Sequence, residues 1–359
     1  MDEKQKKEYL ESYEFIKKQG EEAVKKLESK KQKETKEQKE TKPKPLKIQS
    51  LNSTQQIKHR SYVYSILELP NSRIATGDFS GYITLFSVDY NKKESKKIKE
   101  EKGHDDRINS LLKLSQDRLV SSSRDKAVKV WKINGDAIKL IKTLKGHDHF
   151  VHQVIILTKD TIASGSLDKT IRVWNVNTDK EEKTETAIQQ LKEKFAICSL
   201  LKLKDKNEIV SGGQGTEVAF WNTKTFKREH SVGCCDCSSL NGIIELPNQL
   251  IAVCGGYSST IDVIDTKNYQ RIKQIECKGY IVKSDYGALS SLHLLNNGTI
   301  IYSHDKCFCQ ILSDNYVVSF KLKEEKEFVG VAVTSSSNGE YIIADNWNNG
   351  ITIFKVSYN

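Results

Sequence analysis

Two stretches of this chain carry histidine, serine and aspartate in the same order, a combination that has the composition of a catalytic triad. The first set is His104, Ser121 and Asp125, and the second is His147, Ser164 and Asp168. In a triad the histidine takes the proton of the serine hydroxyl, and the aspartate orients the imidazole. Whether these residues are nucleophilic or structural depends on the elements that hold them.

Three histidines near the second set have the residue type that binds metals. His147, His149 and His152 bring three imidazoles into six residues. Successive side chains of an extended strand point to opposite faces, so a strand here would turn these rings apart. We therefore predict no metal site on this segment.

A cysteine cluster is the other metal candidate. Cys234, Cys235 and Cys237 fall in an expected loop, but four-ligand zinc sites are usually two separated pairs, and Cys277 is the only obvious loop thiol to complete one. We predict no metal, and a redox-sensitive loop and an inert loop remain the alternatives. The other cysteines discussed fall in strand patterns and are expected to be small buried apolar residues: Cys198, Cys254, Cys307 and Cys309.

The common motifs of enzymes are missing from the sequence. It contains no phosphate-binding Gly-x-x-x-x-Gly-Lys-Ser/Thr loop, no His-Glu-x-x-His and no Gly-x-Ser-x-Gly elbow. Gly213 and Gly215 match only the first glycines of a dinucleotide fingerprint, and they precede an expected strand rather than a helix. We predict no catalytic residues, no cofactor and no enzymatic activity.

A repeat of regular length organises the chain. Similar strands end in tryptophan at Val128–Trp131, Ile171–Trp174 and Val218–Trp221, with the tryptophans 43 and 47 residues apart. A glycine–histidine pair precedes the first two of these strands, at His104 and His147. This period and these end residues are typical of the four-stranded blades of a β-propeller.

The same period extends over residues 46–359 and predicts seven blades. Seven closing strands end at Phe86, Trp131, Trp174, Trp221, Ile264, Ile311 and Phe354. Only a few residues follow the strand of Phe354, so the seventh blade lacks a fourth strand of its own. The segment Leu46–Leu51 is expected to supply that strand and to close the ring. The predicted fold is therefore all-β.

These features resemble the WD40 repeat family. In that family a histidine, a serine or threonine, a turn aspartate and a tryptophan form a structural hydrogen-bonded tetrad. The resemblance implies two such tetrads: His104, Ser121, Asp125 and Trp131, and then His147, Ser164, Asp168 and Trp174. It therefore implies a structural role, not a nucleophilic one, for both sets.

Other blades depart from the family pattern. His59 is a candidate replacement for the histidine of blade one. The turn position holds Ser80, Gly215, Ser258 and Asn348 in four blades, and aspartate again only at Asp305. These departures weaken individual blades but leave the strand period intact.

The resemblance also implies where partners bind. In WD40 proteins, contacts concentrate on the narrower top face, at residues that flank the start of each inner strand and at those just before the turn aspartate. Here the top face comprises Tyr62, Tyr64, Phe79, Arg107, Asn109, Arg124, Phe150, His152, Leu167, Asn241, Tyr257, Ser290, His304 and Trp347, with Glu327 as the acidic exception. Aromatic residues and arginine are enriched at the energetic centres of interfaces.

The first 45 residues differ from the rest. Apolar residues recur at helical spacing over about residues 1–30, which predicts a charged helix, with self-association as a coiled coil as one alternative. Residues 31–45 lack that pattern and predict a flexible linker rich in lysine and glutamate. The arm contains 14 Lys and 11 acidic residues, interleaved, so its net charge is only 14 − 11 = +3.

Composition limits the remaining choices. The chain has 359 residues and a net charge of +10. No apolar run approaches the roughly 20 residues needed to span a bilayer, and the N-terminus has no apolar signal segment, so we expect a cytoplasmic protein without membrane insertion.

The favoured function is a noncatalytic scaffold or adaptor that binds a short acidic or phosphorylated peptide of a protein partner. The alternative, less favoured because no unbroken basic block is present, is a component of an RNA–protein complex.

Overall fold

The computed structural model describes part of the chain. The described residues are 48–177, 187–234, 239–256, 260–276, 291–294, 300–304, 307–311, 317–321, 332–336, 338–346 and 350–358. They belong to a compact unit Lys47–Asn359, separate from the unit Met1–Leu46. All regular elements within these ranges are strands. The helix predicted over residues 1–30 and the linker over 31–45 lie outside the described residues.

The described residues form seven antiparallel sheets of four strands each. The first three are β2 (Val63–Leu69), β3 (Arg73–Asp78), β4 (Tyr82–Asp89) and β5 (Glu94–Lys102); β6 (Ile108–Lys113), β7 (Arg118–Ser123), β8 (Val128–Asn134) and β9 (Ala137–Leu144); and β10 (Val151–Thr158), β11 (Thr161–Ser166), β12 (Thr170–Asn175) and β13 (Gln189–Lys192). The next two are β14 (Ile197–Lys202), β15 (Glu208–Gly213), β16 (Glu217–Asn222) and β17 (Arg228–Gly233); and β18 (Ser239–Leu246), β19 (Leu250–Gly256), β20 (Thr260–Asp265) and β21 (Gln270–Glu276). The last two are β22 (Ser291–Leu294), β23 (Ile300–His304), β24 (Cys307–Ile311) and β25 (Val317–Lys321); and β1 (Ile48–Lys58), β28 (Gly350–Tyr358), β27 (Tyr341–Asn346) and β26 (Val333–Ser335).

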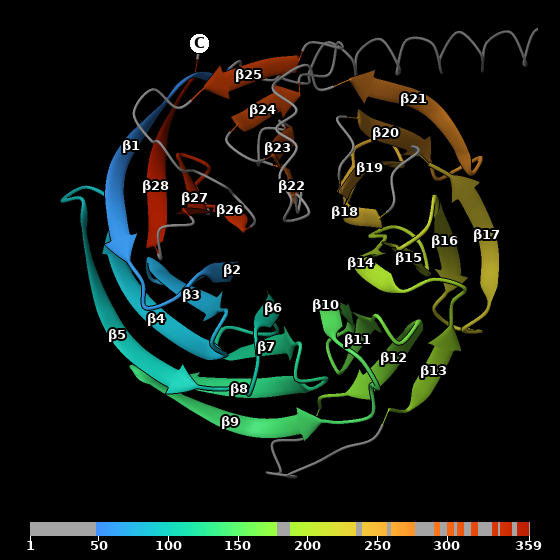
Figure 1. Cartoon of the computed structure of the whole chain (residues 1–359), viewed down its shortest axis with the longest axis horizontal. Coiled ribbons are helices and arrows are strands. Elements are labelled where there is room, and N and C mark those ends of the chain that lie inside the picture. The colour runs from blue at the N-terminus through green and yellow to red at the C-terminus, as the bar shows by residue number, and fades with distance from the viewer. Residues whose placement is uncertain are drawn as a thin grey trace, which may run out of the picture. The chain divides into compact units, whose positions relative to one another are not determined.

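The inner strands of the sheets contact one another in a closed ring. Strand β2 contacts β6, β6 contacts β10, and the series continues through β14, β18, β22 and β26, which contacts β2 again. Figure 1 shows the sheets of this unit arranged around a common centre, with these strands innermost. The arrangement is consistent with the predicted propeller.

Apolar side chains fill the space between neighbouring sheets. Strands β3, β7 and β11 are buried along nearly their whole length, on both faces, as expected for sheets enclosed between two others. Ile83 and Leu85 of β4, for example, pack in one cluster with Ile108 and Trp131 of the next sheet. The ring is therefore held together by burial between sheets as well as by hydrogen bonds within them.

The N-terminal strand completes the last sheet. Strand β1 pairs with β28 from Ile48 opposite Tyr358 to Lys58 opposite Gly350. Ile57 of β1 packs in a cluster with Val63 and Ile353, which joins the first and last sheets. The prediction that an N-terminal segment closes the ring is confirmed, but the strand is longer than the expected segment and continues to Lys58.

Candidate partner-binding face and the buried polar tetrads

The structure brings the four residues of each predicted tetrad together. Trp131 Nε1 donates to Ser121 Oγ at 2.8 Å, His104 Nε2 lies 2.7 Å from the same oxygen, and His104 Nδ1 lies 2.7 Å from Asp125 Oδ2. Since the indole can only donate, the chain of bonds is complete when the serine hydroxyl donates to Nε2 and Nδ1–H donates to the carboxylate. Ser121 is fully buried, so this hydroxyl is used for structure.

The second tetrad repeats this geometry one sheet later. Trp174 Nε1 donates to Ser164 Oγ at 2.8 Å, and His147 lies 2.8 Å from that oxygen and 2.7 Å from Asp168 Oδ2. Each aspartate also accepts backbone N–H groups, which closes the turn before the third strand of its sheet. The repeated sets are therefore turn clamps that connect the strands of one sheet.

Burial and hydrogen bonding have opposite effects on the pKa values of the aspartates and histidines in these clamps. Burial disfavours the charged form of Asp125, but the hydrogen bond and charge of His104 and the backbone N–H groups of Ala127 and Asp105 together outweigh it and lower the pKa of the carboxyl to about 2. The pKa of Asp168 is lowered for the same reasons. Burial lowers the pKa of His104 and of His147, despite the neighbouring aspartates.

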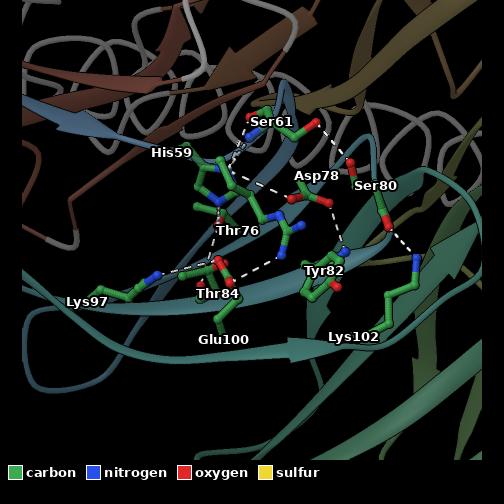
Figure 2. Close-up of polar contacts among 11 residues, drawn as sticks. His59, Ser61, Thr76, Asp78, Ser80, Tyr82, Thr84, Lys97, Glu100 and Lys102 are labelled. Carbon is green, nitrogen blue, oxygen red and sulfur yellow. Dashed lines mark hydrogen bonds and ion pairs between the residues drawn. The ribbon is translucent and has the colours of Figure 1, made fainter.

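The first sheet holds a variant of this arrangement, made of His59, Thr76 and Asp78 and shown in Figure 2. His59 replaces the usual histidine, with Nε2 3.0 Å from Thr76 Oγ1. The carboxylate near its Nδ1 belongs to Asp78, at 3.9 Å, and Asp78 Oδ1 accepts the N–H of Tyr82. The expectation that Ser80 occupies the aspartate position was therefore incomplete, because the carboxylate comes from a residue two positions earlier in the chain.

A fourth clamp was not predicted from the sequence. Trp221 Nε1 donates to Ser211 Oγ at 2.8 Å, as in the two predicted tetrads, but the carboxylate of Glu193 takes the place of the histidine, 3.5 Å from Ser211 Oγ. Arg228 of β17 pairs with Glu193 at 3.3 Å and also with Glu217. The only sequence signal was the position of Glu193 shortly before an inner strand. Arg228 comes from the outer strand, which the family pattern does not include.

The ring encloses a polar cavity of about 220 Å³ at the inner strands. Five predicted top-face residues line it: Tyr64, Arg107, Asn109, His152 and Asn241. Arg107 Nε donates to Asn109 Oδ1 at 2.8 Å, and Asn109 Nδ2 donates to the carbonyl of Val151 at 2.7 Å. The cavity is therefore bordered by side chains from several sheets that hold one another in place.

Predicted residues of three sheets form what we call the arginine–aromatic row, consisting of Phe79, Tyr64, Arg107, Arg124 and Phe150. The rings of Phe79 and Tyr64 lie 6.2 Å apart, and the guanidinium of Arg107 lies 4.1 Å from the centroid of Tyr64. The guanidinium of Arg124 lies 4.9 Å from the centroid of Phe150. The backbone N–H of Arg124 donates to the carbonyl of Arg107 at 2.9 Å and connects the two halves of the row.

Neither arginine of the row forms an ion pair in the described part of the chain, although the nearby charge of Asp106 partly offsets the positive charge of Arg107. The arginines that form ion pairs there are Arg60, Arg172, Arg228 and Arg271. Burial and the nearby charge of Arg124 lower the pKa of Arg107. Burial, followed by these two arginines, lowers the pKa of His152 to about 4, so this imidazole is neutral at pH 7. Arg107, which lines the cavity, therefore brings a positive charge to it.

The other top-face residues have varied positions. Tyr62 and Phe79 are 44% and 46% exposed. Leu167 N donates to the carbonyl of Phe150, and His304 is the last residue of β23. Tyr257, Ser290, Glu327 and Trp347 lie outside the described residues. Phe195, which the sequence analysis did not select, is 41% exposed beside an inner-strand start, like Tyr62.

The metal candidates do not converge in the described ranges, where no group of three or more His, Cys, Asp or Glu could hold an ion. His147 belongs to a clamp, His149 packs edge-on against Phe150, and His152 faces the cavity.

The described cysteines also lie at separate places in the fold. Cys234 follows β17 outside any strand, as expected, and is buried beside Val232, and Cys254 is buried as predicted. Cys198 lies in strand β14 as predicted, but it is only partly buried and lines the cavity, so it is less buried than expected. Cys235, Cys237 and Cys277 lie outside the described residues, and the side chains of Cys307 and Cys309 are not described.

Comparison with known proteins agrees with the repeat pattern. A family model described as "WD domain, G-beta repeat" matches residues 95–132 and 138–175, the parts of the chain that hold Trp131 and Trp174. No curated protein matches the chain. Among the described residues, no helix is long and apolar enough to span a membrane.

Proposed function

We propose that this chain, a member of the WD40 repeat family, is a noncatalytic scaffold or adaptor with a seven-bladed propeller. WD40 repeats are in general platforms for protein interaction. In this proposal the top face binds a short acidic or phosphorylated peptide of a protein partner. The N-terminal arm of residues 1–45 contacts a second partner or another copy of the chain, and the protein acts in the cytoplasm.

The arginine–aromatic row is the observation that carries the proposal. Arg107 and Arg124 stack on Tyr64 and Phe150, and neither has an ion-pair partner among the described residues. Stacking of this kind contributes about 0.5–2 kcal/mol and restricts a long side chain. An acidic peptide would supply the missing negative charge, and the exposed ring of Phe79 would contact its apolar residues.

The test is affinity capture from a lysate of the source cells, followed by mass spectrometry. The baits are the intact chain, residues 46–359, and the intact chain with Arg107→Glu and Arg124→Glu. A matched control carries Lys113→Glu and Lys132→Glu, which change two exposed charges of the same sheet away from the row.

We expect protein partners that survive nuclease treatment, that are lost with the arginine variant and that persist with the lysine control. The alternative function predicts the opposite pattern, in which the captured proteins depend on RNA, persist with the arginine variant and are lost without residues 1–45. That result would replace the scaffold proposal with the RNA–protein one.

A further inference from the structure

We propose that the top face reads a phosphate monoester, carried by a phosphoserine or phosphothreonine of the partner, and that this group sits between Arg107 and Arg124 at the edge of the cavity. This inference rests on the proposed function and specifies the chemical group that the scaffold recognises. It follows from the charge, orientation and surroundings of the two guanidinium groups.

The two guanidiniums share one electropositive site. The N–H of Arg124 bonds the carbonyl of Arg107, and their charges are close enough for Arg124 to disfavour protonation of Arg107. Several other arginines of the described residues pair with carboxylates: Arg228 lies between Glu193 and Glu217, and Arg60 pairs with Glu100. Placing two like charges together with an ion pair to neither costs free energy, part of which a bound anion would recover.

Both guanidiniums are already oriented. The ring of Tyr64 covers one face of Arg107, Asn109 accepts its Nε–H at 2.8 Å, and the Tyr64 side chain is a further hydrogen-bond partner, so the guanidinium is held in place beside the cavity. Phe150 covers Arg124, whose Nε is buried and has no hydrogen-bond partner. A buried donor without a partner costs about 1–3 kcal/mol, so an acceptor on the ligand would recover part of this penalty. Such preorganisation reduces the entropy lost on binding.

A phosphate monoester fits this site better than a carboxylate does. It carries a charge of roughly −1.5 to −2 at pH 7 and three strong acceptor oxygens, so it can neutralise and bridge two guanidiniums at once. A single carboxylate has one charge and can engage one fork. His152 is neutral at pH 7, so the positive charge near the cavity comes from the two arginines and not from this imidazole.

The surroundings favour a phosphate attached to a peptide over a free one. Phe79 of the row and Tyr62, whose carbonyl accepts the N–H of Phe79, are both close to half exposed. A free phosphate would contact neither ring, whereas residues beside a phosphoserine or phosphothreonine would pack on them. Aromatic contacts of this kind dominate the energy of many interfaces.

The experiment measures binding of the labelled full chain to an oriented peptide array. Each peptide has a central phosphoserine or phosphothreonine in degenerate flanks, and matched arrays carry the unmodified residue or glutamate instead. We expect at least about tenfold stronger retention on the phosphorylated array than on the glutamate array, equivalent to about 1.4 kcal/mol. Arg107→Lys and Arg124→Lys keep the positive charge but lose the planar guanidinium, which can donate two parallel hydrogen bonds. Each variant should reduce retention several-fold. The Lys113→Gln, Lys132→Gln control should bind as the unchanged chain does.

Thermal unfolding of each variant establishes that it is folded, and Arg124→Lys tests the site independently if Arg107→Lys unfolds. Equal retention on the phosphorylated and glutamate arrays would overturn the phosphate assignment, and so would retention that is insensitive to Arg124→Lys. Binding of inorganic phosphate as tightly as the best peptides, or of phosphoinositide vesicles in preference to peptides, would also overturn it.

A second readout separates this inference from the proposed function. If partners captured through the arginines persist after phosphatase treatment of the lysate, the scaffold proposal stands and the phosphate inference fails. If capture is independent of the arginines, both fail.

Discussion

The guanidinium of Arg107 lies 4.1 Å from the ring centroid of Tyr64, and the two residues belong to different sheets. Tyr64 is on β2, and Arg107 precedes β6, so the contact crosses the boundary between two blades of the proposed propeller. The ring of Tyr64 thus orients the guanidinium of Arg107 toward the cavity. The position of this charge therefore depends on how the first sheet packs against the second.

The first prediction concerns this contact. Tyr64→Phe keeps an aromatic face under Arg107 and should retain most partner or peptide binding, whereas Tyr64→Leu should reduce it about three- to tenfold, because a cation–π contact contributes about 1 kcal/mol. Titration of both variants with the same peptide measures the difference. Equal affinities would show that the ring does not position the guanidinium.

The second prediction concerns the clamp of Ser164. Ser164→Ala removes the acceptor of Trp174 and the hydroxyl partner of His147, so two buried polar groups lose a hydrogen bond. We expect the free energy of unfolding to fall by about 2–4 kcal/mol in denaturant titration. Thr225→Ala, at an exposed turn, is the control and should change it by less than about 0.5 kcal/mol. A near-neutral Ser164→Ala would mean that the clamp contributes little.

The third prediction concerns the unpredicted clamp. Arg228→Gln leaves the carboxylates of Glu193 and Glu217 without their counter-charge and should destabilise the protein by about 1–2 kcal/mol at pH 7, a modest value because Arg228 is partly exposed. Adding Glu217→Gln should restore part of the loss, since one uncompensated charge is then removed. Chemical denaturation of the single and double variants measures the coupling. Strictly additive losses would contradict this account.

The fourth prediction concerns acid. The pKa values of His104, His147, His152 and His293 are lowered in the folded state, so below about pH 6.5 the unfolded chain binds protons that the folded chain does not. The free energy of unfolding should therefore fall as the pH drops from 6.5 toward 4. It should fall further below pH 3.8, where Asp125, with a pKa of about 2, is protonated first in the unfolded chain.

His293 offers a specific test of this pH dependence. Burial lowers its pKa to about 4, and its Nε2 lies 3.0 Å from Ser335 Oγ. His293→Gln removes the titrating group and should reduce the change in unfolding free energy between pH 6.5 and 4 by up to about 3 kcal/mol. Unfolding midpoints at several pH values measure this slope. An unchanged slope would show that His293 is not the group responsible.

The fifth prediction concerns ring closure. Removing residues 1–47 leaves every described strand in place and should leave the melting temperature nearly unchanged. Removing residues 1–58 deletes β1, exposes the edge of β28 and removes Ile57 from its cluster, so the melting temperature should fall by at least about 5 °C and the protein should associate. Calorimetry and size-exclusion chromatography compare the two forms.

Much of the fold could be predicted from local patterns. The strands that end at Trp131, Trp174 and Trp221 lie where the period placed them, as third strands of their sheets. The resemblance to the WD40 family also implied the two complete tetrads, each of which lies within one repeat. The repeat can be recognised in one sequence because each blade must satisfy the same strand and turn geometry.

The variant clamps were less accessible for a physical reason. In the first sheet the carboxylate comes from Asp78 instead of the expected position, and in the fourth Arg228 reaches the clamp from an outer strand. In each sheet the charged residue lies beside the side chain that bonds the buried hydroxyl, which is His59 in the first sheet and Glu193 in the fourth. Burial demands a hydrogen-bond partner but does not specify which residue supplies it.

The sequence by itself determined the all-β repeat, and its resemblance to the WD40 family supplied the candidate top-face residues. Only the tertiary structure decided that Tyr64 stacks on Arg107, that Phe150 stacks on Arg124, and that five of the candidates share one cavity. These relationships join separate sheets, so they depend on how the sheets pack around the ring. Strand period and residue type describe each blade, whereas contacts between blades arise only when the ring closes.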